Sequence, residues 1–237
     1  MAGILAADAD FFIHSLTPVK FLGQTVYFTT THVSILIVMS ILILLALVVR
    51  IKLKGRSIED KPTGLLNAIE LAMELLESMV KGSMGKSAEK YMNYIGTLFL
   101  FLLFSNISGL LGLRPPTADY GVTFPLGIIT FVLIQYNNIK WNKTAAFTDL
   151  FKPLPFLFPI NLIGEIAVPF SISLRLFGNV VSGTVIMALI YGLLSKIAIL
   201  WPGVLHAYFD LFSGAIQTYV FCMLTMVWIT QKIPEDV

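Results

Sequence analysis

The feature that most constrains this chain is a succession of long segments without a formal charge. The first covers the 29 residues between Lys20 and Arg50, and two more cover residues 91–113 and 120–139. About 20 apolar residues are enough to cross the hydrocarbon core of a bilayer, so each segment predicts one membrane-spanning helix. In the whole chain 57% of residues are hydrophobic and 13% are charged, whereas soluble domains carry about 25% charged residues. The composition therefore indicates an integral membrane protein.

Two longer segments follow toward the C-terminus. Lys152 and Lys196 enclose 43 residues, and Lys196 and Lys232 enclose another 35. As single helices these segments would be roughly 50–65 Å long, well beyond a hydrocarbon core of ~30 Å. Neither segment contains a central polar loop, so we expect two long, tilted helices that form a hairpin around Lys196–Pro202.

The loop between the first two spans contains an amphipathic segment, LLNAIELAMELLESMV. Charged residues share one face, namely Glu70, Glu74, Glu77 and Lys81. Apolar residues recur at helical spacing on another face, namely Ile69, Met73, Leu76 and Val80. The segment is too short and too charged to span a bilayer. It is predicted to lie along the membrane surface or against a partner helix.

These patterns predict an all-α membrane protein with five transmembrane helices and one interfacial helix, in a single domain over residues 1–237. Twelve of the sixteen Lys and Arg residues lie in 50–90, in 140–152 and at 232. Because cytoplasmic loops carry an excess of Lys and Arg, the N-terminus is expected outside and the C-terminus in the cytoplasm. The expected parts are an extracellular segment (1–31), spans at 32–50, 91–113, 119–139, 156–195 and 199–231, and an amphipathic helix at 64–85.

Three ionisable residues interrupt the last two apolar segments: Glu165, Arg175 and Asp210. A charged side chain at the bilayer centre costs at least ~2.5–3.5 kcal/mol, so such residues usually face the protein interior or water and mark ion pathways. An arginine keeps its charge; Arg175 therefore predicts a fixed electrostatic barrier or a counter-charge for a carboxylate. The simpler alternative is a buried ion pair that only joins two helices.

Polar residues extend this set along both helices. Residues four apart share a helical face, which places Ser171, Arg175 and Asn179 on one polar stripe. On the last helix one face carries Asp210, Ser213, Gly214 and Gln217. If the two helices pack antiparallel, Gln217 can meet Arg175.

Several motifs resemble subunit a of the bacterial F-type ATP synthases. They are SLRLFGN (173–179), NLIGEIAVP (161–169), IQTYVFCMLTMVWI (216–229) and RPPTADYGVT (114–123). The resemblance covers nearly the whole chain from residue 30 onward. It implies a non-catalytic, ion-translocating stator subunit in a bacterial plasma membrane. The implied partners are a ring of small hairpin rotor subunits, peripheral stalk subunits, the soluble ATPase sector and membrane lipid.

The resemblance also implies roles for single residues. Arg175 matches the arginine that discharges each ring carboxylate and separates two offset aqueous half-channels. Asn179 matches the asparagine four residues later, and Gln217 matches the glutamine that faces the arginine. Glu165 matches an acidic position of the cytoplasmic half-channel.

The sequence departs from the common bacterial pattern at two positions. Many relatives have glutamate where this chain has Thr184, and many have histidine where it has Asp210. We therefore expect the outer half-channel to hold its carboxylate on the last helix. His206, one turn from Asp210, could supply the imidazole.

Two other classes of protein fit part of this pattern. One is a small secondary transporter with a midplane arginine–carboxylate site, and the other is a passive scaffold for membrane subunits. Transporters often contain internal repeats, and this chain has none. The single cysteine, Cys222, allows no internal disulfide, no metal or cofactor motif is present, and a net charge of +2 gives no reason to expect nucleic acid. The choice between proton and sodium ion stays open.

Overall fold

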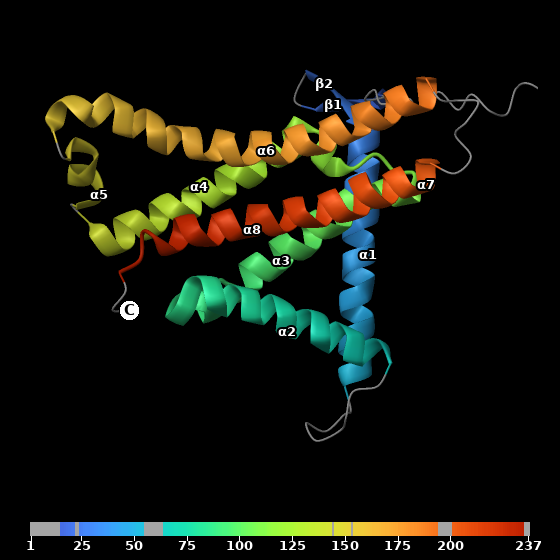
Figure 1. The fold of residues 1–237 in the computed structure, drawn as a ribbon, viewed down its shortest axis with the longest axis horizontal. Helices are drawn as coiled ribbons and strands as arrows, with labels where there is room; N and C mark the ends of the chain where they lie inside the picture. The colour runs from blue at the N-terminus through green and yellow to red at the C-terminus, as the bar shows by residue number, and fades with distance from the viewer. Residues whose placement is uncertain are drawn as a thin grey trace, which may run out of the picture.

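A computed structural model describes residues 15–21, 24–54, 64–143, 145–152, 154–193 and 201–234. Its strands and helices are β1 (Ser15–Phe21), β2 (Gln24–Thr29), α1 (Thr30–Leu53), α2 (Leu65–Met84), α3 (Ala88–Ile107), α4 (Tyr120–Asn142), α5 (Ala145–Thr148), α6 (Phe158–Leu193), α7 (Trp201–His206) and α8 (Gly214–Thr230) (Figure 1). Short 3₁₀ turns join several of them. Within the described residues, five helical stretches are long and apolar enough to cross a membrane, which confirms the predicted all-α membrane fold.

The hairpin of β1 and β2 was not predicted from the sequence. Its strands are antiparallel, with Val19 opposite Val26 and Pro18 opposite Tyr27. Val, Tyr and Phe residues favour strands, which is the signal that could have found it. The backbone N–H of Thr29 donates to His32 Nδ1 at 3.3 Å, so the hairpin runs directly into α1. Residues 1–14 of the expected N-terminal segment lie outside the described residues.

The length of α6 determines how the molecule can sit in a bilayer. Its 36 residues correspond to about 54 Å, which exceeds a hydrocarbon core of ~30 Å. In Figure 1, α6 and α8 run in nearly the same direction, and α1 runs at a steep angle to both. The two directions cannot both follow the membrane normal, so α6 and α8 are strongly tilted when α1 spans upright. Residues 194–200, which contain most of the expected hairpin turn, lie outside the described residues.

The last helix is not α-helical throughout, which the expectation of a long, tilted helix did not address. Between α7 and α8, residues Ala207–Ser213 form a π-helical segment. Such segments are rare and often occur at functional sites. This one contains Asp210, and nothing in the sequence pattern marks it. The extra residue per turn changes which side chains face the other helices.

The core lies between α2, α3 and α8. Buried residues of α2, including Leu76 and Val80, pack against α3 and α8, while Glu77 and Lys81 form an exposed ion pair on the opposite face. Met73, which was predicted on the apolar face, is 49% exposed. The amphipathic segment therefore packs against α3 and α8 of the same chain, and Figure 1 shows α2 below these two helices.

Helices α4 and α6 approach each other closely at Gly127. A Cβ atom at this position would lie 2.8 Å from the carbonyl oxygen of Pro169 and 3.2 Å from Ser173 Cβ. Pro169 lies within α6 and has no N–H to donate to the carbonyl of Glu165. The contact at Gly127 therefore fixes α6 against α4 close to the polar residues considered below.

We expect Gly127→Ala to lower the free energy of unfolding by about 1–3 kcal/mol, because the added methyl group overpacks the α4–α6 contact. Thermal unfolding of the purified protein in detergent, followed by circular dichroism, measures the change. Gly82→Ala is the matched control, since a Cβ there meets nothing within 4 Å. Equal unfolding temperatures for Gly127→Ala and the control would contradict this account of the contact.

Candidate functional site

The polar stripe predicted on α6 lies on its exposed surface. Ser171, Arg175 and Asn179 are all exposed. Large apolar side chains of α6 are exposed as well, including Leu174 beside Arg175 and Ile163 further toward the start of the helix, which are 51% and 66% exposed. Within the described part of the chain, the Arg175 guanidinium forms no hydrogen bond or ion pair. A permanent cation therefore stands exposed on a helix whose other exposed large side chains are mostly apolar.

Gln217 on α8 contacts this stripe through Asn179. Asn179 Nδ2 donates to Gln217 Oε1 at 2.5 Å. The Gln217 side chain is 5% exposed, and its Nε2 has no hydrogen-bond partner among the described residues. The structure thus joins Gln217 to the residue one turn beyond Arg175. Contact between Gln217 and Arg175 itself stays a prediction.

A narrow cavity lies between α6, α8 and the π-helical segment. Thr184, Asp210, Ser213 and Gln217 are among its lining residues, and its volume is about 20 Å³. That volume holds about one water molecule. We call it the Asp210 cavity. Thr184 and Asp210 line this cavity from two different helices. This is the arrangement expected if a carboxylate at either position can serve the same cavity.

The carboxylate of Asp210 is held by its neighbours. His206 Nδ1 lies 2.6 Å from Asp210 Oδ2, so the imidazole contacts the carboxylate. On the other side, a Cβ at Gly109 would lie 3.1 Å from Asp210 Cγ. A side chain at this point of the turn after α3 would press on the carboxylate, which would have to shift by a few tenths of an ångström.

Asn106 is a site residue that the sequence analysis missed. It lines the Asp210 cavity and is 3% exposed. Its Nδ2 donates to the Gly214 carbonyl and to Thr218 Oγ1, both at 3.0 Å, and its Oδ1 accepts from Thr117 Oγ1 at 2.6 Å. The available signal was an amide inside an apolar segment, because a buried amide must find hydrogen-bond partners. Asn106 joins the start of α8 to the turn before α4.

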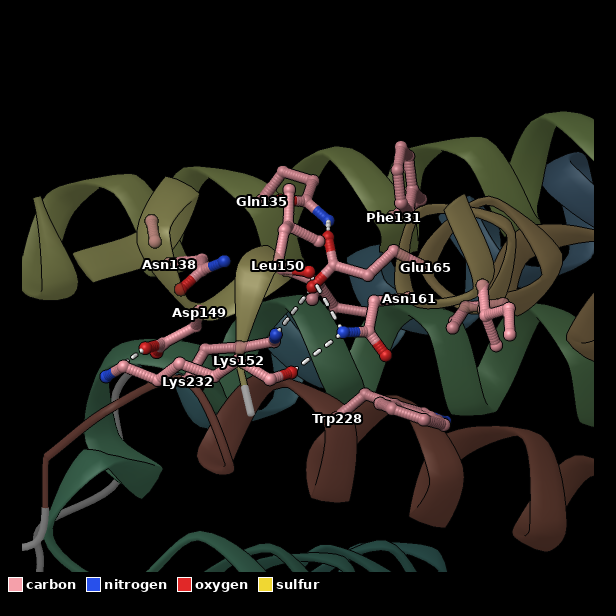
Figure 2. A pocket seen from close by; sticks show the side chains of 15 residues that line it. Phe131, Gln135, Asn138, Asp149, Leu150, Lys152, Asn161, Glu165, Trp228 and Lys232 are labelled. Atoms are coloured by element: carbon pink, nitrogen blue, oxygen red, sulfur yellow. Dashed lines mark hydrogen bonds and ion pairs between the residues drawn. The ribbon is translucent and has the colours of Figure 1, made fainter. Parts of the chain in front are cut away.

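Glu165 lines a separate and larger cavity, which we call the Glu165 cavity. Its volume is about 570 Å³, and Gln135, Asn161 and Lys232 are among its lining residues. Gln135 Nε2 donates to Glu165 Oε2 at 2.9 Å, and Lys232 Nζ lies 2.9 Å from Oε1 (Figure 2). Sequence analysis missed Gln135 and Lys232 because they lie far from Glu165 in the chain, on α4 and just after the end of α8.

The two cavities lie on opposite sides of Arg175 along α6. Glu165 precedes Arg175 by ten residues and Thr184 follows it by nine. At ~1.5 Å per residue these intervals are about 15 Å and about 14 Å. The fold and site therefore define a polytopic membrane protein in which an exposed arginine lies on a long helix between two cavities that carboxylates help to line.

Comparison with known proteins identifies the family. The model of the ATP synthase A chain family matches residues 32–230. Subunit a of the Priestia megaterium ATP synthase is 33% identical, with 94% of this chain and 99% of the relative covered. The sodium ion specific subunit a of Propionigenium modestum is 37% identical, covering 86% of this chain and 75% of the relative. This chain belongs to the ATP synthase A chain family, the ion-translocating subunit of the membrane sector.

We expect Asn106→Leu to destabilise the protein by about 1–3 kcal/mol, because the Thr117 hydroxyl and the Gly214 carbonyl lose a buried partner. Asn93→Leu on the exposed surface of α3 is the matched control. Thermal unfolding in detergent measures both variants. Adding Asn106→Leu to Thr117→Val should cost less than the sum of the single changes, since the two residues share a hydrogen bond. Strict additivity would contradict the network.

Proposed function

We propose that this chain is the stator subunit through which ions pass between the membrane and the rotor ring of an F-type ATP synthase. In this role it is non-catalytic and couples a transmembrane ion flow to rotation of the ring. ATP is made elsewhere, in the soluble sector of the complex. The chain would lie in a bacterial plasma membrane with its C-terminus in the cytoplasm, as the distribution of Lys and Arg indicates.

The observation that carries the proposal is the charge of Arg175 on an apolar outer surface. A charged group at membrane depth is costly unless it is paired, and the described part of the chain supplies no partner for Arg175. A carboxylate brought to this surface by another subunit would neutralise it. Arginine does not release its proton. When the two groups meet, Arg175 therefore displaces the ion from the carboxylate but does not itself carry the ion.

The two cavities supply the access routes that such a mechanism needs. An ion entering from one side would reach the ring through the Asp210 cavity, and an ion leaving to the other side would pass the Glu165 cavity. Their separation along α6 prevents a direct passage, and the fixed charge of Arg175 repels a cation between them. An ion must then travel on the ring from one cavity to the other, which makes flow depend on rotation.

Asn179 and Gln217 fit a role beside the arginine. Their mutual hydrogen bond fixes the Gln217 amide on α8. The buried Gln217 Nε2 donor can then be satisfied by an acceptor such as a water molecule or the arriving carboxylate. Ser171 extends the polar surface one turn in the other direction.

Asp210, Thr184 and His206 would form the outer relay. A carboxylate and an imidazole in hydrogen-bond contact can pass a proton between them. A carboxylate with hydroxyl and amide oxygens can also bind a sodium ion, since such oxygens suit hard cations. A relative that is named sodium ion specific makes the second ion a real alternative, so ion identity belongs to the test.

Arg175→Ala should abolish ATP synthesis in energised membrane vesicles while the complex still assembles, because Arg175 is exposed and makes no hydrogen bond or ion pair within the described residues. Arg175→Lys should also fail, since an ammonium lacks the planar fork of the guanidinium and is more strongly hydrated. Arg50→Ala at the end of α1 is the matched control and should synthesise normally. Normal synthesis in either Arg175 variant would refute the role given to this residue.

Asp210→Asn keeps the shape of the side chain and removes its charge. We expect severe loss of ATP-driven pumping with the complex assembled, and partial recovery when Thr184→Glu is added, because both residues face the same cavity. Glu74→Gln on the exposed face of α2 is the control. Pumping is followed with a pH-sensitive dye and, separately, with radioactive sodium. Wild-type pumping by Asp210→Asn would exclude Asp210 from the ion path.

A further inference from the structure

The Glu165 carboxylate is held by two residues from other parts of the chain, one on α4 and one just after α8. Lys232 Nζ contacts one oxygen and Gln135 Nε2 the other, each at 2.9 Å (Figure 2). The side chains of Lys232 and Glu165 are only 24% and 27% exposed. A partly buried ion pair is screened less by water than an exposed pair, so its geometry is better defined.

Lys232 is itself anchored, although it follows the end of α8. Its backbone N–H donates to the Ile229 carbonyl at 3.2 Å, and its own carbonyl accepts from Asn142 Nδ2 at 3.4 Å. The next residue, Ile233, packs against the hydrophobic core. The lysine therefore reaches Glu165 from a fixed backbone.

The charges that line the Glu165 cavity are balanced. Asp149 and Lys152 form a second pair at 2.8 Å, with side chains that are 55% and 70% exposed. With Glu165 and Lys232 the lining holds two carboxylates and two ammonium groups. Removing Lys232 would change the formal charge of the lining from zero to −1. A cavity with a net negative charge holds a passing cation longer.

We propose that Lys232 is a positioning residue for Glu165 and sets how strongly the Glu165 cavity holds a passing cation. The inference rests on the proposed function, in which this cavity lies on the ion path. Without the ammonium group, the Glu165 carboxylate keeps a single partner among the described residues, the hydrogen bond from Gln135, and is free to leave its position. A displaced carboxylate and a longer stay of the cation both slow ion passage.

The test is passive cation flow through the membrane sector. Vesicles carrying the complete complex are stripped of the soluble sector, and proton and sodium fluxes are measured after a potential is imposed. We expect Lys232→Gln to lower the flux about five- to tenfold, within the range of coupling energies between contacting residues. Lys232→Arg keeps the charge and should restore most of the flux. Lys81→Gln, which breaks the exposed pair with Glu77 on α2, is the matched control and should equal the wild type.

A double variant separates this role from a structural one. If Lys232 acts through Glu165, then adding Lys232→Gln to Glu165→Gln should cause no further loss of flux. Lys232→Met, which keeps the length of the stem, is measured in parallel in case Lys232→Gln does not assemble. Unchanged flux in assembled Lys232→Gln or Lys232→Met, or a further loss in the double variant, would overturn the inference and leave the proposed function intact. A wild-type membrane sector that conducts neither cation would overturn both.

Discussion

The rest of this structure depends on one constraint, the cost of placing the Arg175 charge at membrane depth. Arginine cannot lose its proton to escape that cost, so its surroundings must be arranged around it. α6 carries Arg175 midway between Glu165 and Thr184 on a helix too long to stand along the membrane normal. The neighbouring helices supply polar groups on both sides and leave the guanidinium itself exposed. A fold that buried Arg175 in an internal ion pair would leave no charge for another subunit to meet.

Each carboxylate in this arrangement has a basic neighbour, but the two pairs differ in construction. Asp210 and His206 are one turn apart near the start of the last helix, so their contact is local. Glu165 and Lys232 are 67 residues apart in sequence and meet only because α6 and the end of α8 lie together. The local pair can form as soon as the helix does. The distant pair forms only when α6 and the end of α8 have packed together, so it depends on their relative position.

Buried polar groups between helices specify that position more closely than apolar contacts do. Apolar side chains tolerate small shifts, whereas an unsatisfied buried donor or acceptor costs about 1–3 kcal/mol. Asn106 joins α8 to the turn before α4, and Thr31 Oγ1 on α1 donates to Asp119, whose carboxylate also caps α4. Gly127 then allows α4 and α6 to approach closely. These contacts together fix the helices that form the two cavities.

The sequence by itself determined the membrane class, the helical segments and the unusual position of Arg175, because apolar length and intramembrane charge are local properties of the chain. The polar face of Asp210, Ser213 and Gln217 also followed from helical periodicity. Tertiary structure alone decided the π-helical segment at Asp210, the contact of Gln217 with Asn179, and the partners Asn106 and Lys232. Such partners are set by how helices pack against one another, and neither periodicity nor composition encodes which distant side chains will meet.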